Sequence, residues 1–428
     1  MRSRFRQAAP AGVVAAVVLF PLVPWLVAGS VEDRFSGVAT LKSVANLAAL
    51  FGIAAWAANL VLASRIRPVE RAIGGLEQLY GLHRRVGVLV VVLAATHALF
   101  LTLHAGGSSL DLYLPAAGWS TFTGVIALVL LVGLVVTSLV GRVSYQTFVL
   151  IQRLLGVAFI LGALHTFAVH GTAASSPTLT IYLACLTTAG IASLGYRLAG
   201  GPLGIGRYPY SVDEVRSLDD DAVEIVMAPV GRPLAFQAGQ FVYATFHQSG
   251  IPRESHPFTI ASAPGDDSLR LAVKRFGDFT TSIMGLRPGS RTQLEGPFGC
   301  FYLRSDSAHP QTWIAGGIGI TPFLSWARSL DKSVPADLYY CTPGPEQAHF
   351  LDELYDIADR YPTFRVIPMR KRSLGHLTVG DIEAVNPNIS HGHIFICGPP
   401  LMIDNLRAGL VTRGVPSRRI HSETFDFR

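Results

Sequence analysis

Cysteine is scarce in this sequence. The four that occur lie far apart, with no Cys-x-x-Cys motif: Cys185, Cys300, Cys341 and Cys397. This spacing excludes a disulfide scaffold, a zinc site built from cysteines and a four-cysteine iron–sulfur cluster. Charge is scarce too, since only 15% of the 428 residues are charged, against roughly 25% in soluble domains. The net charge is +6, but the basic residues are not gathered into one stretch, so nucleic acid is not an expected partner.

Long apolar runs fill the first 200 residues. A membrane-spanning helix needs about 20 apolar residues. Six stretches meet this requirement, near residues 10–29, 40–64, 84–104, 118–141, 146–170 and 177–198. The second and fourth of these contain no charged residue between Ser43 and Ser64 or between Gly118 and Gly141. We therefore predict an integral membrane protein whose residues 1–200 form a bundle of six membrane-spanning helices in the lipid bilayer.

Basic residues flank these spans unevenly. They precede the first span, separate the second from the third and the fourth from the fifth, and follow the sixth: Arg2, Arg4, Arg6, Arg65, Arg67, Arg71, Arg84, Arg85, Arg142, Arg197 and Arg207. Because basic loops stay on the cytoplasmic side, both termini are predicted to be cytoplasmic. The arginine-rich start followed by an apolar run also matches a cleaved signal peptide, although Pro21 and Pro24 interrupt the run.

Histidines lie within or at the ends of two predicted spans. His83 and His97 are on the third, with His104 at its outer end, and His165 and His170 are on the fifth. Polar groups in the bilayer are costly and usually functional. His83 and His97 are about four helical turns apart, so they share one helix face at a separation of about 21 Å. Imidazole is an axial ligand of haem iron, and two facing helices can each supply one; the alternative is hydrogen bonding between helices.

The second half of the sequence has the pattern of a globular protein. Short alternating runs at 222–227, 240–246, 258–262 and 269–273 predict a small antiparallel barrel. After Gln311, strands and helices alternate around a glycine-rich turn, which predicts an α/β Rossmann-like nucleotide-binding domain. We therefore expect three domains: the membrane bundle at 1–200, the barrel at 205–308 and the nucleotide domain at 309–428.

Two motifs of the predicted barrel have the composition of a flavin site. One is His256-Pro257-Phe258-Thr259, which continues to Ser262; the other is Gly277-Asp278-Phe279-Thr280, at the start of a predicted helix. A flavin needs an aromatic neighbour, polar groups for its ring and donors for its diphosphate. N–H groups at the start of a helix can supply those donors. The alternative for Asp278 and Thr280 is an ordinary helix cap.

Two further motifs mark the nucleotide domain. The first runs from Ile314 through Gly316, Gly317 and Gly319 to Thr321-Pro322, and the second is Cys397-Gly398-Pro399. A strand that ends in a glycine turn lets a diphosphate approach the backbone, and proline suits the first turn of the following helix. The segment 342–346 has no Lys or Arg, whereas Arg370, Lys371 and Arg372 follow the next strand. The choice between NADPH and NADH therefore stays open.

Together, these spans and motifs resemble the ferric reductase / NADPH oxidase superfamily, whose FAD and nucleotide domains are of the ferredoxin–NADP reductase type. The resemblance implies b-type haem between the third and fifth spans, with His97 and His165 as the outer pair of ligands and His83 as an inner ligand. The fourth ligand position holds Gln152 where the family has histidine. One or two haems are therefore expected.

The resemblance also assigns the residues of the two cofactor sites. It implies FAD binding by His256, Pro257, Phe258, Thr259, Ser262, Gly277, Asp278, Phe279, Thr280 and Phe427, with Phe425 as the alternative aromatic residue. It implies NAD(P)H binding by Gly316, Gly317, Gly319, Thr321, Pro322, Cys397, Gly398 and Pro399. No side chain is expected to act as an acid or base, because the cofactors carry the chemistry.

The resemblance implies an oxidoreductase that moves electrons from cytoplasmic NAD(P)H through FAD and haem to an acceptor across the membrane. The expected acceptor is ferric iron. The alternatives are reduction of oxygen to superoxide, electron supply to an extracytoplasmic partner protein, and a flavin reductase for which the spans are only an anchor.

Overall fold

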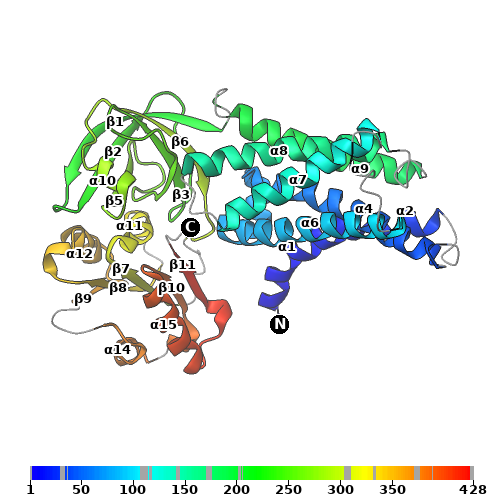
Figure 1. The fold of residues 1–428 in the computed structure, drawn as a ribbon. Helices are drawn as coiled ribbons and strands as arrows, with labels where there is room; N and C mark the ends of the chain where they lie inside the picture. The colour runs from blue at the N-terminus through cyan, green and yellow to red at the C-terminus, as the bar shows by residue number, and fades with distance from the viewer. Residues whose placement is uncertain are drawn as a thin grey trace. The chain divides into compact units, whose positions relative to one another are not determined.

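The computed structural model describes residues 2–28, 34–35, 37–106, 114, 118–140, 145–169, 176–200, 204, 206–302, 310–330, 334–370, 376–387 and 389–424. The chain forms two compact units, residues 1–203 and 204–428. The first is helical, and the second contains the strands (Figure 1).

The first unit contains the six predicted spans, and this prediction is confirmed. Six helices within the described residues are long and apolar enough to cross a membrane. The helices of the unit are α1 (Arg2–Leu19), α2 (Leu22–Val27), α4 (Ala39–Ala63), α5 (Arg67–Ile73), α6 (Leu76–His104), α7 (Trp119–Val140), α8 (Tyr145–Ala168) and α9 (Pro177–Gly200). Helix α6 begins eight residues before the predicted span at 84, because Gly74 and Gly75 both have positive φ and separate it from α5.

Helix α4 is the central helix of this bundle. It packs against α1, α6, α8 and α9, while α7 packs mainly against α8. Its buried face is rich in small residues, among them Ala45, Ala48 and Gly52. Small side chains let helix backbones approach closely in a membrane, where dispersion contacts and hydrogen bonds replace the hydrophobic effect as the source of association. The small-residue face of α4 therefore brings α6 close enough for side chains of α6 to bond its backbone.

The second unit begins with a six-stranded antiparallel sheet that curls into a nearly closed barrel. Its strand order is β4-β3-β6-β1-β2-β5, and a bridge between Ile260 and Leu271 connects the two edges. Alternate residues of each strand point inward and form one apolar core. The elements are β1 (Arg207–Ser217), β2 (Ala222–Pro229), β3 (Phe241–His247), β4 (His256–Thr259), β5 (Leu269–Lys274), α10 (Asp278–Ile283) and β6 (Arg291–Phe298).

A five-stranded parallel sheet follows, in the order β11-β10-β7-β8-β9. When the strands are numbered along the chain from β7, their order from the β9 edge is 3-2-1-4-5. In a doubly wound sheet of this order, ligands bind at the carboxyl ends of the two central strands, here β7 and β10. The antiparallel barrel and this α/β domain are as predicted. The elements are β7 (Gln311–Gly316), α11 (Thr321–Arg328), β8 (Ala336–Thr342), α12 (Leu351–Arg360), β9 (Phe364–Arg370), α14 (Val379–Val385), β10 (His393–Cys397), α15 (Pro400–Thr412) and β11 (Ile420–Glu423).

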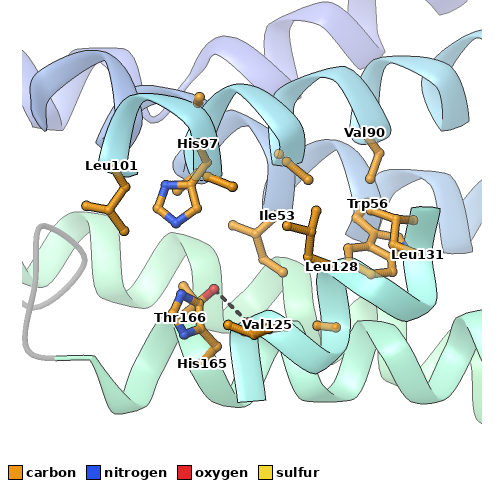
Figure 2. A pocket seen from close by; sticks show the side chains of 18 of the residues that line it. Ile53, Trp56, Val90, His97, Leu101, Val125, Leu128, Leu131, His165 and Thr166 are labelled. Carbon is orange, nitrogen blue, oxygen red and sulfur yellow. Dashed lines mark hydrogen bonds between the residues drawn. The ribbon is translucent and has the colours of Figure 1, made fainter. Parts of the chain in front are cut away.

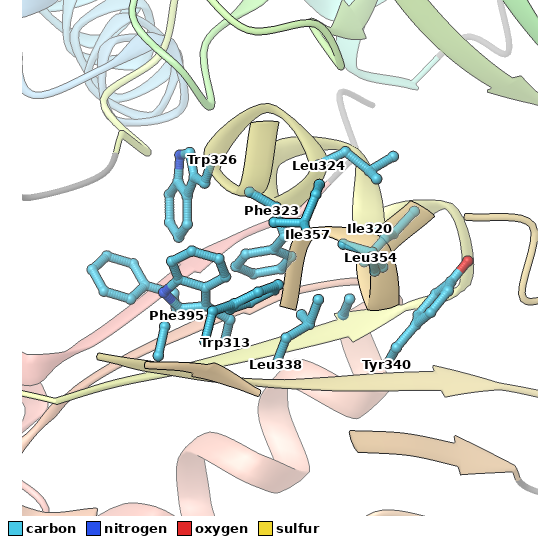
Figure 3. Close-up of a cluster of buried hydrophobic side chains, with 14 of the residues drawn as sticks. Trp313, Ile320, Phe323, Leu324, Trp326, Leu338, Tyr340, Leu354, Ile357 and Phe395 are labelled. Atoms are coloured by element: carbon cyan, nitrogen blue, oxygen red, sulfur yellow. The ribbon is translucent and has the colours of Figure 1, made fainter. Parts of the chain in front are cut away.

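Two apolar clusters cover the two faces of this sheet. On one face, α11 and α12 pack over a group of fully buried aromatic side chains that includes Trp313, Phe323 and Trp326 (Figure 3). On the other face, α14 and α15 pack on isoleucines at alternate positions of the strands, such as Ile314 and Ile396. Burial on both faces explains why these strands read as continuous apolar runs in the sequence.

Helix α11 also holds the barrel against the nucleotide domain. The Ser325 hydroxyl donates to the Ser262 carbonyl at 2.7 Å, and the Arg328 guanidinium donates to the Ala261 carbonyl at 2.8 Å. The Trp326 indole donates to the Ala238 carbonyl at 3.0 Å. These bonds attach the helix that follows the glycine turn to the segment that follows the His-Pro-Phe-Thr motif.

Candidate functional site

Two membrane histidines face one another across the helical bundle. His97 comes from α6 and His165 from α8, and their ring centroids are 6.2 Å apart with an angle of 61° between the planes. Figure 2 shows both rings directed into one cavity. Metal–imidazole bonds are about 2 Å long, so rings at this separation can ligate one metal ion placed between them.

The Nε2 atoms of this pair are available to a ligand, because the Nδ1 atoms are already hydrogen-bonded. His97 Nδ1 lies 2.9 Å from the carbonyl oxygen of Ala45, and His165 Nδ1 lies 2.8 Å from that of Ser120. A carbonyl oxygen only accepts, so each Nδ1 carries the proton. In a neutral imidazole this leaves the Nε2 lone pair as the metal-binding atom, which is the usual second-sphere arrangement of a metal-ligating histidine.

The cavity between the histidines is lined by apolar side chains of four helices. It encloses about 840 Å³, including its open mouth, and its walls come from α4, α6, α7 and α8. Gly124 of α7 forms the wall beside His165: a Cβ atom there would lie 2.6 Å from Nδ1 of the imidazole. A glycine that makes room for a ligating ring, two free Nε2 atoms and apolar walls together fit a haem.

His83 lies about four turns before His97 on the same helix. Its Nδ1 is 3.2 Å from the carbonyl oxygen of Asn59, so both histidines bond the backbone of α4 and share the helix face that their spacing predicts. The side-chain oxygen of the same residue, Asn59 Oδ1, is buried without a hydrogen-bond partner. Gln152, the residue of α8 at the fourth ligand position, is half-buried. His83 thus has the tautomer of a metal ligand.

The His-Pro-Phe-Thr motif lies on an edge strand of the barrel. His256 stacks on Phe279, with ring centroids 3.7 Å apart, and its Nε2 contacts the Glu254 carboxylate at 3.1 Å. Pro257 and Phe258 continue β4, and the Thr259 hydroxyl is buried without a hydrogen-bond partner. Burial of such a group costs free energy, so an unpartnered hydroxyl here fits a polar group of a bound flavin. In the register of β3 and β4, His256 is opposite Ala244 and Thr259 is opposite Phe241, so the hydroxyl lies on the other face of β4 from the aromatic stack.

The second flavin motif forms a capped turn. The Thr280 hydroxyl accepts from the backbone N–H groups of Phe276 and Gly277 at 2.8 and 3.0 Å. Asp278 is the first residue of α10. Thr280 therefore acts as a local cap, which is the alternative to a diphosphate site that the sequence offered for Asp278 and Thr280. Ser262, by contrast, is completely buried and its hydroxyl accepts from the backbone N–H of Arg270 at 3.2 Å.

The two nucleotide motifs lie in direct contact at the carboxyl ends of β7 and β10. A Cβ atom at Gly319 would lie 2.4 Å from the Cys397 carbonyl oxygen, and one at Gly398 would lie 3.1 Å from Gly316 Cα. Only glycine fits this approach. Gly317 has positive φ, and Thr321 and Pro322 begin α11 directly after the turn. Pro399 precedes α15, so two helix starts and a glycine turn converge where an open α/β sheet binds its dinucleotide.

Cys397 is completely buried at the end of β10. Burial raises the pKa of its thiol, and the Glu423 carboxylate raises that pKa further. Cys397 therefore stays a neutral thiol. Glu423 is the partner of Cys397 in the register of β10 and β11. The sequence alone did not single out Glu423, because the nearest nucleotide motif lies more than twenty residues before it in the chain. Phe425, Phe427 and His170 lie outside the described residues.

Family profiles match three consecutive segments of the chain. Residues 48–163 match the ferric reductase like transmembrane component, residues 207–295 an FAD-binding domain and residues 313–408 an oxidoreductase NAD-binding domain. The first segment includes His83 and His97 and ends two residues before His165, the second includes the His-Pro-Phe-Thr motif, and the third includes both nucleotide motifs.

Curated relatives match half of the chain. The reductase subunit of an aromatic O-demethylase from Amycolatopsis is 30% identical over 232 residues, which are 50% of this chain and 68% of that protein. The reductase component of propane 2-monooxygenase from Rhodococcus jostii is 25% identical and matched over 62% of its length. Among solved structures, a cytochrome P450 reductase from Amycolatopsis is similar with a TM-score of 0.46 and 26% identity, over 51% of this chain and 69% of that one.

The fold and these matches define a class: an NAD(P)H oxidoreductase of the membrane, with an FAD domain and a nucleotide domain attached to six spans. More particularly, the chain belongs to the ferric reductase / NADPH oxidase superfamily, in which a ferric reductase-like membrane domain supports transmembrane electron transfer.

Proposed function

We propose that the protein is a flavocytochrome that moves electrons from cytoplasmic NAD(P)H through FAD and b-type haem to ferric iron on the other side of the membrane. When bound, FAD converts a hydride into single electrons, and haem carries these electrons through the bilayer. The protein supplies ligands, distances and a dry environment.

One observation carries this proposal: the facing pair of His97 and His165. Each ring is held by a carbonyl of a neighbouring helix and presents Nε2 to the same cavity. Histidines that only joined helices would satisfy both ring nitrogens within the bundle or point them at the headgroups. The pair is therefore better explained as two ligands that would hold a haem, which we assign to this cavity.

In the second unit, we assign flavin binding to the aromatic stack of His256 and Phe279, the vacant Thr259 hydroxyl and the neighbouring Pro257, Phe258 and Ser262. We assign the segment of Gly277, Asp278 and Thr280 to the same site, since Phe279 within it stacks on His256. We assign NAD(P)H binding to the converging glycine turn and Cys-Gly-Pro segment, where Cys397 stands as a neutral thiol beside Glu423.

The acceptor has two alternatives to ferric iron. Oxygen would give superoxide, and a docked extracytoplasmic protein would receive the electrons without release of a small product. Purified protein offered chelated ferric iron, oxygen or a candidate protein in turn, with NAD(P)H as donor, separates the three by the product formed.

The central prediction concerns His165. His165→Ala should lower haem absorbance and abolish acceptor reduction, because one of the two ligands of the outer haem is lost, while FAD reduction by NAD(P)H persists in the second unit. His104→Ala is the matched control: His104 is on the same helix as His97, but its Nδ1 bonds the Val38 carbonyl and it does not line the cavity. A reduced-minus-oxidised spectrum measures the result. Undiminished haem absorbance in His165→Ala would refute the assigned ligand.

The haem-to-flavin ratio of the same purified protein tests the inner position. A ratio near one places haem at the outer pair alone, in keeping with Gln152 at the fourth position. A ratio near two assigns His83 a haem as well, with another partner or none. A protein with FAD and no haem would leave only the membrane-anchored flavin reductase.

A further inference from the structure

One aromatic side chain of the barrel lies open to solvent beside the flavin motifs. Phe276 is 89% exposed, whereas the other phenylalanines that the structure describes in the second unit are buried or half-buried. It directly precedes Gly277-Asp278-Phe279-Thr280, the segment assigned above to the flavin. A single apolar residue at a surface needs no explanation by itself, so its position and the way its backbone is held decide whether it has a role.

Hydrogen bonds hold the backbone on both sides of Phe276. Its own N–H donates to the Thr280 hydroxyl at 2.8 Å. The preceding residue, Arg275, donates from its backbone N–H to the Asp221 carbonyl at 2.7 Å, and its guanidinium donates to the Asp220 carbonyl at 2.7 Å. The Arg275 side chain is therefore directed to the loop between β1 and β2 and leaves the ring of Phe276 uncovered. The turn thus presents this ring to solvent at a defined place.

The same turn carries a second aromatic ring that points the other way. Phe279, three residues later, is 7% exposed and stacks on His256, with ring centroids 3.7 Å apart. One ring of the turn therefore belongs to the site assigned to the flavin ring system, and the other faces solvent. In FAD, the diphosphate joins the flavin half to the adenosine half. With the flavin ring near His256 and the diphosphate at the turn, the adenine is left on the solvent side, where Phe276 lies.

Adenine needs a partner of a particular kind. The flavin residues assigned above account for the ring system and the diphosphate, and they leave the adenine without one. A purine has two flat π-faces, and stacking of a base on an aromatic side chain changes affinity by roughly tenfold to a hundredfold. An exposed phenylalanine suits this contact, because stacking removes apolar surface of both partners from water. Phe276 has the chemistry and the position that the adenine requires.

We propose that Phe276 binds the adenine of FAD by stacking, and that this contact makes the protein select FAD over FMN, which lacks the adenylate half. The inference rests on the proposed flavin site and specifies the residue that recognises the part of the cofactor farthest from the redox chemistry. It assigns Phe276 to binding alone, since the adenine takes no part in hydride or electron transfer.

The test measures equilibrium binding of FAD and of FMN, by flavin fluorescence, to the full-length protein freed of flavin and held in nanodiscs. We expect the unaltered protein to bind FAD at least about tenfold more tightly than FMN. Phe276→Ser should weaken FAD binding about tenfold or more and leave FMN binding unchanged, because FMN has no adenine to stack. Phe276→Tyr keeps the aromatic face and should bind FAD as the unaltered protein does. Phe276→Leu keeps only apolar bulk and should recover a small part of the loss.

Val230→Ala is the matched control, because Val230 is another apolar residue on the surface of the barrel, 57% exposed, and should leave FAD affinity unchanged. Equal FAD affinity of Phe276→Ser and the unaltered protein would overturn the inference. Equal weakening of FAD and FMN would also overturn it, since Phe276 would then only support the turn. The measurement needs neither electron donor nor acceptor. Selective loss of FAD affinity therefore supports the inference even if NAD(P)H fails to reduce the flavin, a failure that would count against the proposed function alone.

Discussion

At the scale of single residues, one glycine decides whether the outer histidine can take its position. Gly124 of α7 faces the imidazole of His165 at a distance that admits no side chain. The nearby carbonyl of Ser120, one turn earlier on the same helix, accepts from that ring. Helix α7 therefore both orients the ring and makes room for it, although no histidine lies on α7.

Gly124→Ala is predicted to weaken haem binding. The new methyl group would lie 2.6 Å from His165 Nδ1, so the ring must move, and overpacking of this kind costs about 1–3 kcal/mol. We expect haem affinity to fall about tenfold or more, measured by haem titration of the apoprotein. Gly133→Ala on the same helix is the control, because its Cβ meets nothing within 4 Å. Equal haem affinity in the two variants would contradict the role of Gly124.

At the scale of elements, α11 joins the nucleotide domain to the barrel through a buried cation. Arg328 is 8% exposed and lies 2.7 Å from Glu353 of α12 and 3.4 Å from Glu224 of β2. Its guanidinium also donates to the Ala261 carbonyl, next to Ser262. One arginine thus connects two helices and two segments of the barrel, so the flavin motif and the glycine turn are held by the same element.

The pair of Arg328 and Glu353 predicts a pH-dependent stability. Burial raises the pKa of Glu353, but the Arg328 hydrogen bond and charge lower it more, so the net shift is below the ordinary value of 4.5. A carboxyl whose folded pKa is depressed stabilises the fold above pH 4.5 and loses this contribution as the pH falls. Glu353→Gln should therefore lower the stability of the second unit at pH 7 by about 1 kcal/mol, because the carboxylate is partly exposed.

The difference between Glu353→Gln and the unaltered protein should shrink on acidification below pH 4.5, as measured by the Tm for release of FAD. Asp352→Asn, one residue earlier in the first turn of α12 and exposed, controls for the effect of an acid at a helix N-terminus. A Glu353→Gln deficit that stays constant from pH 7 to pH 4 would contradict this account.

At the scale of the whole molecule, the distribution of arginines predicts which side of the membrane carries the second unit. Arginines lie between the spans α4 and α6, where α5 begins at Arg67. The positive-inside rule predicts that this side is cytoplasmic. The second unit follows α9 directly and is expected on the same side, where NAD(P)H is available.

Thiol labelling tests this orientation. Cys300 is exposed in the second unit, whereas Cys397 is buried there. Burial raises the pKa of Cys341 to about 12 and that of Cys397 strongly, so neither is a ready nucleophile. A membrane-impermeant maleimide should label Cys300 in inverted vesicles and not in intact cells, and Cys300→Ser should abolish the signal. Labelling of Cys300 from outside intact cells would reverse the orientation.

Much of this architecture is legible in the sequence because it depends on local patterns. Hydropathy over about 20 residues defines a span, and alternation over about six residues defines a strand. A glycine turn between a strand and a helix, such as Gly316–Gly319, is typical of a nucleotide-binding domain. The boundaries were predicted less accurately. The third span was predicted to begin near residue 84, at Arg84 and Arg85, whereas α6 begins at Leu76, directly after Gly75. Glu423 could not be identified from the sequence, because its place beside Cys397 depends on the pairing of β11 with β10.

The sequence by itself determined six spans, an antiparallel barrel, a doubly wound domain and the residue types available for haem, flavin and dinucleotide, because each is a property of short stretches of chain. Only the tertiary structure decided that His97 and His165 present Nε2 to one cavity, since the carbonyls that fix their tautomers belong to α4 and α7. Such relations depend on which distant segments pack together, and no local pattern encodes them.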